Sequence, residues 1–93
     1  MTFHEWQTWD QDIHRRALAL RLQMVARMDA TLGAAFGGPP MQASAHLARN
    51  WRGQSWLTPE QARAVRCVLH MHERSFEPER LAARITARRM PPR

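Results

Sequence analysis

The chain has 93 residues, a length typical of one small domain, and its 14 basic and 8 acidic residues give a formal net charge of +6. All 14 basic residues are arginine, which together with abundant alanine is typical of a GC-rich genome. One cysteine excludes an internal disulfide, and no apolar run approaches the roughly 18 residues of a membrane helix. We therefore expect a soluble, cytoplasmic domain of bacterial or phage origin, without a signal peptide or a membrane segment.

The first segment, about residues 3–32, is predicted to form one long amphipathic helix. Thr2 and Glu5 have the spacing of a capping box, and Gly33 stands where helices commonly end. Apolar residues recur at three- and four-residue steps and give the single stripe that a surface helix needs. This stripe comprises Trp6, Trp9, Ile13, Ala17, Leu20, Met24 and Met28.

A second apolar strip lies beside the first one in the later part of this helix. It comprises Leu18, Leu22, Val25 and Leu32. More than half of the helix circumference is apolar from Leu18 onward, so the helix is either central to a bundle or partly buried by another chain. We take this strip as a candidate binding surface for a protein partner or for a second copy in a homodimer.

The rest of the chain predicts shorter helices and no strands, which gives an all-α domain of three or four helices. The predicted elements are a Gly/Pro loop at 33–40, helices at about 41–52, 59–75 and 78–89, and a tail at 90–93. The strongest local signal is Thr58-Pro59-Glu60-Gln61, which combines an N-cap, a proline at the first helical position and a capping box. In the last helix we expect Leu81 and Ile85 to face inward.

The surplus of positive charge falls entirely after residue 32, in stripes on the later helices. The candidate anion-binding residues are Arg49, Arg52, Arg63, Arg66, His70, Arg74, Arg80, Arg84 and Arg88. Guanidinium groups bind carboxylate and phosphate oxygens in a bidentate manner. Three interpretations stay open: an acidic protein surface, nucleic acid read by the third helix, and plain solvation. The connection from Gly53 to Thr58 is longer than the turn of a helix-turn-helix motif.

Four tryptophans are a high number for 93 residues. Trp6, Trp9 and Trp51 lie on predicted helices and fill either the core or an interface. Trp56 lies in a polar loop, and we therefore predict that it contacts a partner; stacking on a nucleic-acid base is the alternative.

No constellation of residues predicts a metal site, a cofactor or catalysis. His70 and His72 are two residues apart and point to different sides of a helix, and Cys67 with His70 gives only two ligands. No phosphate-binding loop, dinucleotide fingerprint or paired acidic motif is present in the sequence. We therefore predict no metal, no cofactor, no catalytic residue and no enzymatic activity.

One stretch of the chain is similar to the small delta subunit of NAD-dependent formate dehydrogenases. It runs from Val25-Ala26-Arg27-Met28 through Phe36 and on to His46-Leu47-Ala48-Arg49-Asn50-Trp51. That family has a comparable helix, an aromatic pair and a His-Leu-x-x-x-Trp stretch. Here Ala35 replaces the second aromatic residue, and Arg52-Gly53-Gln54 replaces a Pro-Arg-Met. The likeness covers under a third of the chain and implies a non-catalytic accessory subunit.

The function that we favour from the sequence is a small non-catalytic interaction protein: an adaptor, an inhibitor or an accessory subunit. Its apolar first-helix strip and its arginine-rich later helices would contact a protein partner. The competing hypothesis is a dimeric nucleic-acid-binding regulator, in which the basic third helix contacts DNA or RNA.

Overall fold

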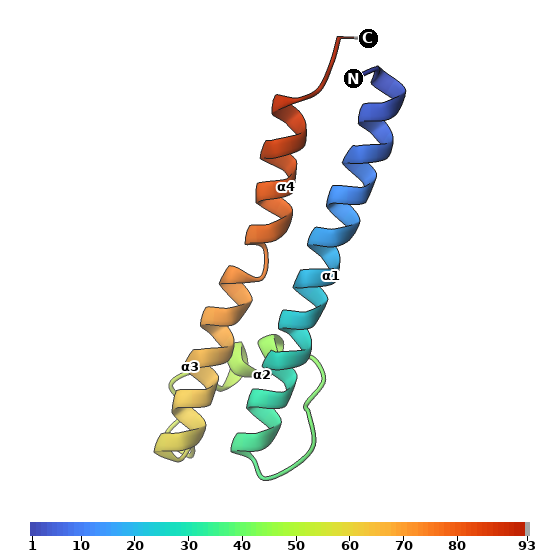
Figure 1. Ribbon diagram of the computed structural model, residues 1–93. Coiled ribbons are helices and arrows are strands. Elements are labelled where there is room, and N and C mark those ends of the chain that lie inside the picture. The colour runs from blue at the N-terminus through green and yellow to red at the C-terminus, as the bar shows by residue number, and fades with distance from the viewer. Residues whose placement is uncertain (93) are drawn as a thin grey trace.

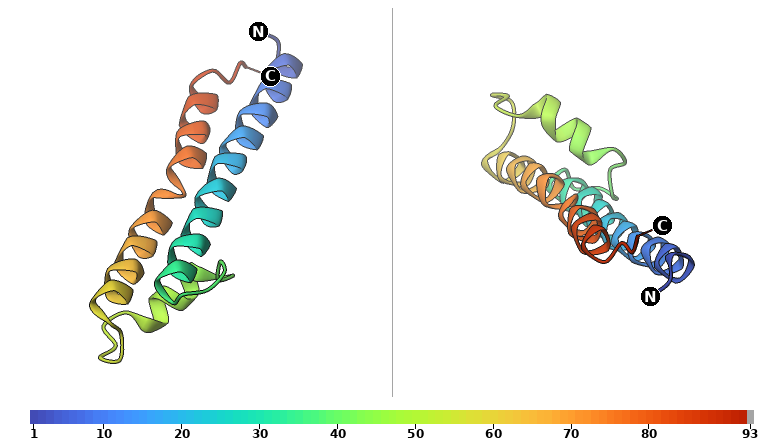
Figure 2. Two further views of the ribbon diagram at one scale, coloured as in Figure 1. Left: turned by 60° about the horizontal axis from the view of Figure 1, so that its bottom comes forward. Right: turned by 90° about the horizontal axis from the view of Figure 1, so that it is seen from above.

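The computed structural model describes residues 1–92, and these form four helices without a strand (Figure 1). The helices are α1 (Phe3–Ala35), α2 (Ser44–Trp51), α3 (Pro59–Arg74) and α4 (Glu77–Arg88). α3 and α4 follow one another end to end and run antiparallel to α1, so that these three helices form one layer. α2 lies on one face of this layer and only at one end of it (Figure 2). The predicted all-α class with a long N-terminal helix is confirmed.

Local sequence signals set the starts of the two longest helices. Thr2 Oγ1 accepts a hydrogen bond from the backbone N–H of Glu5 at 3.1 Å and caps α1. At α3, Thr58 Oγ1 accepts from Gln61 N at 3.1 Å, and Gln61 Oε1 accepts from Thr58 N at 3.0 Å. This reciprocal pair satisfies two backbone donors that the helix itself leaves free. The predicted capping box at Thr58 is confirmed.

The predicted end of the first helix at Gly33 is wrong, because Gly33 lies inside α1, which continues to Ala35. A Cβ atom at this position would lie 2.1 Å from the carbonyl oxygen of Pro39 and 2.9 Å from the Cα of Pro40. Gly33 is therefore needed because the returning loop crosses the helix there. The chain turns at Gly37, whose φ of 71° is a left-handed conformation that glycine adopts without strain.

Asp29 of α1 fixes the start of α2. Its Oδ1 accepts from Ser44 Oγ at 2.5 Å and from Ser44 N at 3.3 Å. Its backbone carbonyl accepts from Met41 N at 3.0 Å. The carboxylate thereby occupies the positive end of the α2 dipole. These bonds hold residues 41–43 in a loop, so that α2 begins at Ser44 and not near residue 41 as the sequence predicted.

The hydrophobic core lies at the end of the molecule where α2 covers the layer. Its fully buried members are Met28, Leu32, Ala48, Val65 and Val68. In the other half, α1 packs against α4 alone, and the buried side chains there are Ala17, Ala82 and Thr86. Small side chains let the two helices approach closely, but a pair of helices cannot enclose large apolar residues on its own.

The molecule is long and thin as a result. Its principal extents are 57 × 22 × 14 Å, and its radius of gyration is 17.8 Å. A compact domain of this length would have a radius of about 12 Å. Its accessible surface of 6695 Å² exceeds by roughly 1,100 Å² the area of about 5,500 Å² typical of a folded monomer of this mass.

Candidate protein-binding surface

An apolar groove runs between α1 and α4 in the half of the molecule that has only these two helices. It has a volume of about 160 Å³ and is lined by Ile13, Ala17, Leu20, Pro78, Leu81, Ala82 and Ile85. Leu20 is 50% exposed, Leu81 49% and Ile85 36%. Large aliphatic side chains therefore stand on both sides of a floor made of alanine.

The groove corrects two expectations from the sequence. Leu81 and Ile85, expected to face inward, border the groove and are open to solvent. Leu20 belongs to the main apolar stripe of α1, yet half of it is exposed. In both cases the helical periodicity identified the apolar face correctly. No further helix covers this face of α1 and α4, because α2 packs at the other end of the layer.

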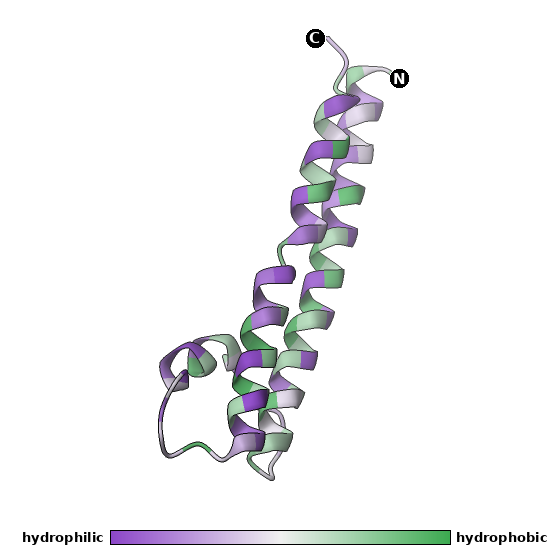
Figure 3. Cartoon of the chain, turned by 90° about the vertical axis from the view of Figure 1, so that its left-hand side faces the viewer, coloured by the Kyte–Doolittle hydropathy of each residue, from purple (hydrophilic) through white to green (hydrophobic). Residues whose placement is uncertain are grey.

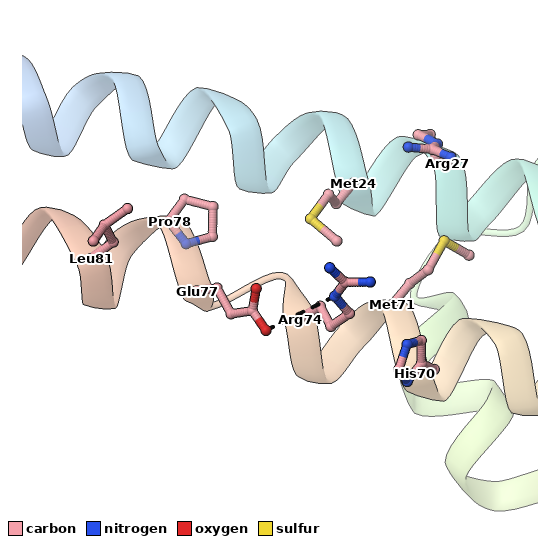
Figure 4. Close-up of a pocket in the computed structure, with 8 residues that line it drawn as sticks. All are labelled: Met24, Arg27, His70, Met71, Arg74, Glu77, Pro78 and Leu81. Carbon is pink, nitrogen blue, oxygen red and sulfur yellow. Dashed lines mark ion pairs between the residues drawn. The ribbon is translucent and has the colours of Figure 1, made fainter.

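A wider pocket continues the groove toward the junction of α3 and α4 (Figure 4). Its volume is about 460 Å³, and its lining residues are Met24, Arg27, His70, Met71, Arg74, Glu77, Pro78 and Leu81. Pro78 and Leu81 line both cavities, so the two form one continuous depression. Arg74 Nε lies 3.9 Å from Glu77 Oε1. Arg27, the other arginine of this pocket, makes no ion pair within residues 1–92.

The residues of the second apolar strip of α1 differ in burial, because only the later part of the strip lies at the end that α2 covers. Leu18 and Leu22 are 46% and 59% exposed, Val25 packs against the core, and Leu32 is fully buried. Leu32 is thus a core residue and is not available to a partner. Leu20 and Leu22 are two residues apart, which places them about 160° apart around the helix. Leu22 therefore lies on the opposite flank of α1 from the groove.

Trp56 is 54% exposed and packs on an aromatic cluster at the C-terminal end of α2. Its ring centroid lies 5.6 Å from that of Trp51 in an edge-on arrangement and 6.3 Å from that of Phe36. Phe36 and Trp51 are 5.1 Å apart. Edge-to-face packing of this kind stabilises aromatic clusters. The exposed side of Trp56 fits the predicted contact with a partner, which stays a prediction.

Trp6 and Trp9 pack at the open end of the α1–α4 pair. Trp6 Nε1 donates to the carbonyl of Thr86 at 2.9 Å, and its ring stacks on Phe3 at 5.7 Å. The guanidinium of Arg89 lies 5.5 Å from the ring centroid of Trp9. This contact of Arg89 was not anticipated, because no local spacing in the sequence relates residues 9 and 89.

The predicted anion-binding residues all lie on the exposed surface. They are Arg49, Arg52, Arg63, Arg66, His70, Arg74, Arg80, Arg84 and Arg88. Hydrophilic residues recur along the side that α3 and α4 present to solvent (Figure 3). Arg52, Arg66 and His70 line one shallow pocket of about 230 Å³ together with Leu69 and Glu73. Arg80 lies 5.9 Å from the centroid of the Phe76 ring.

The described residues bring together no metal-binding or membrane-spanning feature. Among residues 1–92, no three His, Cys, Asp or Glu side chains are grouped so that they could hold a metal ion. Over the same residues, no helix combines the length and the hydropathy that crossing a membrane requires. Cys67 is a free, exposed thiol on α3.

Comparison with protein-family models, with curated protein sequences and with solved structures finds no match to this chain. The resemblance to the delta subunit of formate dehydrogenases therefore rests on the quoted residues alone.

Proposed function

We propose that this chain is a small non-catalytic protein-binding protein, namely an adaptor, an inhibitor or an accessory subunit, whose partner covers the groove between α1 and α4. The observation that carries this proposal is the apolar groove with half-exposed Leu20, Leu81 and Ile85. Exposed apolar patches of this kind on small proteins commonly mark interaction sites.

The energetics support an interface on this face. Full burial of an aliphatic side chain stabilises by about 1.5–3 kcal/mol, so the exposed parts of these three residues still hold roughly 2–4 kcal/mol. The surplus surface of roughly 1,100 Å² is also comparable to the roughly 800 Å² that each partner loses in a standard interface. A partner in the groove would cover the half of the molecule built from α1 and α4 alone, as α2 covers the other half.

The test is affinity capture from native cells, identification of the captured protein, and reconstitution of the complex from purified components. We expect Leu20→Glu and Leu81→Glu to abolish reconstituted binding while leaving the helical circular dichroism unchanged. Leu18→Glu and Leu22→Glu are the matched controls on the opposite flank of α1, and we expect them to retain binding. Loss of binding only in the control variants would instead assign the contact to the second strip.

Nucleic-acid binding is the second candidate function, and one observation favours it. Arg63, Arg66, Arg84 and Arg88 are exposed on α3 and α4 and make no ion pair within residues 1–92. Such arginines would release counterions from a duplex, and the affinity would fall steeply as salt rises. The measurement is a mobility-shift assay with random duplex DNA and RNA at 50 mM salt. Absence of a shift with micromolar protein would remove this candidate.

A further inference from the structure

We infer that the occupant of the groove is an amphipathic helix of a partner protein whose polar flanks carry acidic residues. This inference rests on the proposed function and specifies the chemistry of the partner. Shape and charge support it independently.

The shape of the groove fits a helix. Two antiparallel helices with alanines between them leave a channel parallel to their axes, and a third helix in that channel would complete a bundle. Ile13 and Leu20 are seven residues apart on α1, which is about 10 Å along the helix. Met24, in the adjoining pocket, extends the apolar path to about 16 Å, or three helical turns. An occupant with apolar residues at positions i, i+4, i+7 and i+11 matches this length.

The charges that border the groove are predominantly positive. Arg84 and Arg88 are exposed and follow Leu81 by three and seven residues, so helical geometry places them on the face of α4 next to Leu81, at the edge of the groove. Arg27 follows Leu20 by seven residues on α1 and lines the adjoining pocket. These three arginines make no ion pair within residues 1–92.

The acidic residues near the groove are already paired with arginines. Asp12 Oδ2 lies 3.0 Å from Arg16 Nη2, and Glu77 pairs with Arg74 at 3.9 Å. The three unpaired arginines are thus the charges that remain for a partner. Carboxylates on the flanks of an incoming helix complement them, and such pairs both steer the encounter and select the partner.

A second copy of the chain fits the same groove poorly. In a symmetric dimer the same patch contacts itself, so that the arginines Arg27, Arg84 and Arg88 of one copy would approach the arginines of the other. Each copy also carries a formal net charge of +6. Like charges within the screening length of about 8–10 Å oppose association. The apolar surface alone would permit a dimer, but the charges favour an acidic partner.

The probes for this inference are two fluorescein-labelled 18-residue helical peptides with the same leucine stripe. One carries glutamate on both flanks and the other carries lysine. Fluorescence anisotropy with the full chain should show that the glutamate peptide binds about tenfold more tightly, which corresponds to 1.4 kcal/mol. The preference should shrink at 500 mM salt, and Leu20→Glu combined with Leu81→Glu should abolish binding of both peptides.

A pair of charge-reversed variants separates local from global electrostatics. Replacing Arg27, Arg84 and Arg88 with glutamate should invert the preference between the peptides. Replacing Arg49, Arg63 and Arg66 with glutamate makes the same change in net charge away from the groove, and it should leave the glutamate peptide preferred. Equal effects of both triple variants would overturn the inference, because binding would then follow net charge alone.

Three further outcomes would also overturn the inference. The first is equal binding of both peptides by the wild-type chain. The second is no binding of either peptide. The third is a dimer in sedimentation equilibrium that Leu81→Glu dissociates, since a second copy would then occupy the groove. The reconstitution test of the proposed function stands apart from these results, because a natural partner can bind through the groove without being an acidic helix.

Discussion

The guanidinium of Arg21 donates a hydrogen bond to Glu79 Oε1 at 3.3 Å, and its central carbon lies 4.4 Å from the centroid of the Phe76 ring. One side chain of α1 thus contacts both the start of α4 and the residue that joins α4 to α3. Both charged side chains are about one third exposed, so solvent weakens the ion pair without abolishing it.

Arg21→Ala should lower the free energy of unfolding by about 1–2 kcal/mol, because it removes an ion pair worth at most about 1 kcal/mol and a cation–π contact of similar size. Arg16→Ala is the control, since the pair of Arg16 with Asp12 lies within one helix and is more exposed. Urea denaturation measures both variants. Equal losses of unfolding free energy in the two variants would show that the contacts of Arg21 with Glu79 and Phe76 do not stabilise the packing of α1 against α3 and α4.

Gly33→Ala should destabilise the fold by roughly 2 kcal/mol, although alanine is the better helix former. The new methyl group would collide with the backbone of Pro39, and overpacking of this kind costs about 1–3 kcal/mol. At Gly38 a Cβ atom meets nothing within 4 Å and φ is not positive, so Gly38→Ala should change stability by less than about 1 kcal/mol. Thermal denaturation of the two variants gives the comparison.

Leu32→Ala should cost about 2–5 kcal/mol, because the side chain is completely buried in the core. Leu22→Ala should stay within about 0.5 kcal/mol of the wild type, because most of Leu22 already contacts water. Chemical denaturation of both variants checks the division of the second apolar strip. A comparable loss at Leu22 would mean that this side chain is buried in solution, for example by another copy of the chain.

Asp29→Ala should weaken the attachment of α2 and lower the stability by about 1–3 kcal/mol, since it leaves the buried Ser44 without its acceptor. Urea denaturation measures the loss, and the tryptophan fluorescence should change as well, because Trp51 ends α2 and contacts Trp56. Asp12→Ala removes a half-buried carboxylate far from α2 on the same helix, and it should change the stability by less than about 1 kcal/mol.

The features that depend on a few neighbouring residues were predictable from the sequence. The capping box at Thr58 and Gln61 sets the start of α3, which lies at the predicted residue. The end of α3 and both ends of α4 differ from the predicted ones by one residue. The apolar and charged faces of the helices were also recognised, since the helical period alone separates them.

The features that depend on distant residues were not predictable. Gly33 is inside α1 because Pro39 crosses it, and nothing in the local sequence distinguishes that role from a helix end. The groove was missed for a similar reason. Periodicity shows that Leu81 is on an apolar face, but only the position of α2 shows that this face stays uncovered.

The confinement of the core to one end also predicts an uneven resistance to hydrogen exchange. Amides near Met28 and Val68 should exchange only through global unfolding, because the buried cluster surrounds them. Amides of the first turns of α1 and of the last turns of α4 should exchange through local opening, because little buried apolar surface opposes it. A partner that binds in the groove would slow exchange selectively in the half where α1 packs against α4 alone. The pattern of protection would therefore report on binding even when the sequence of the partner is not known.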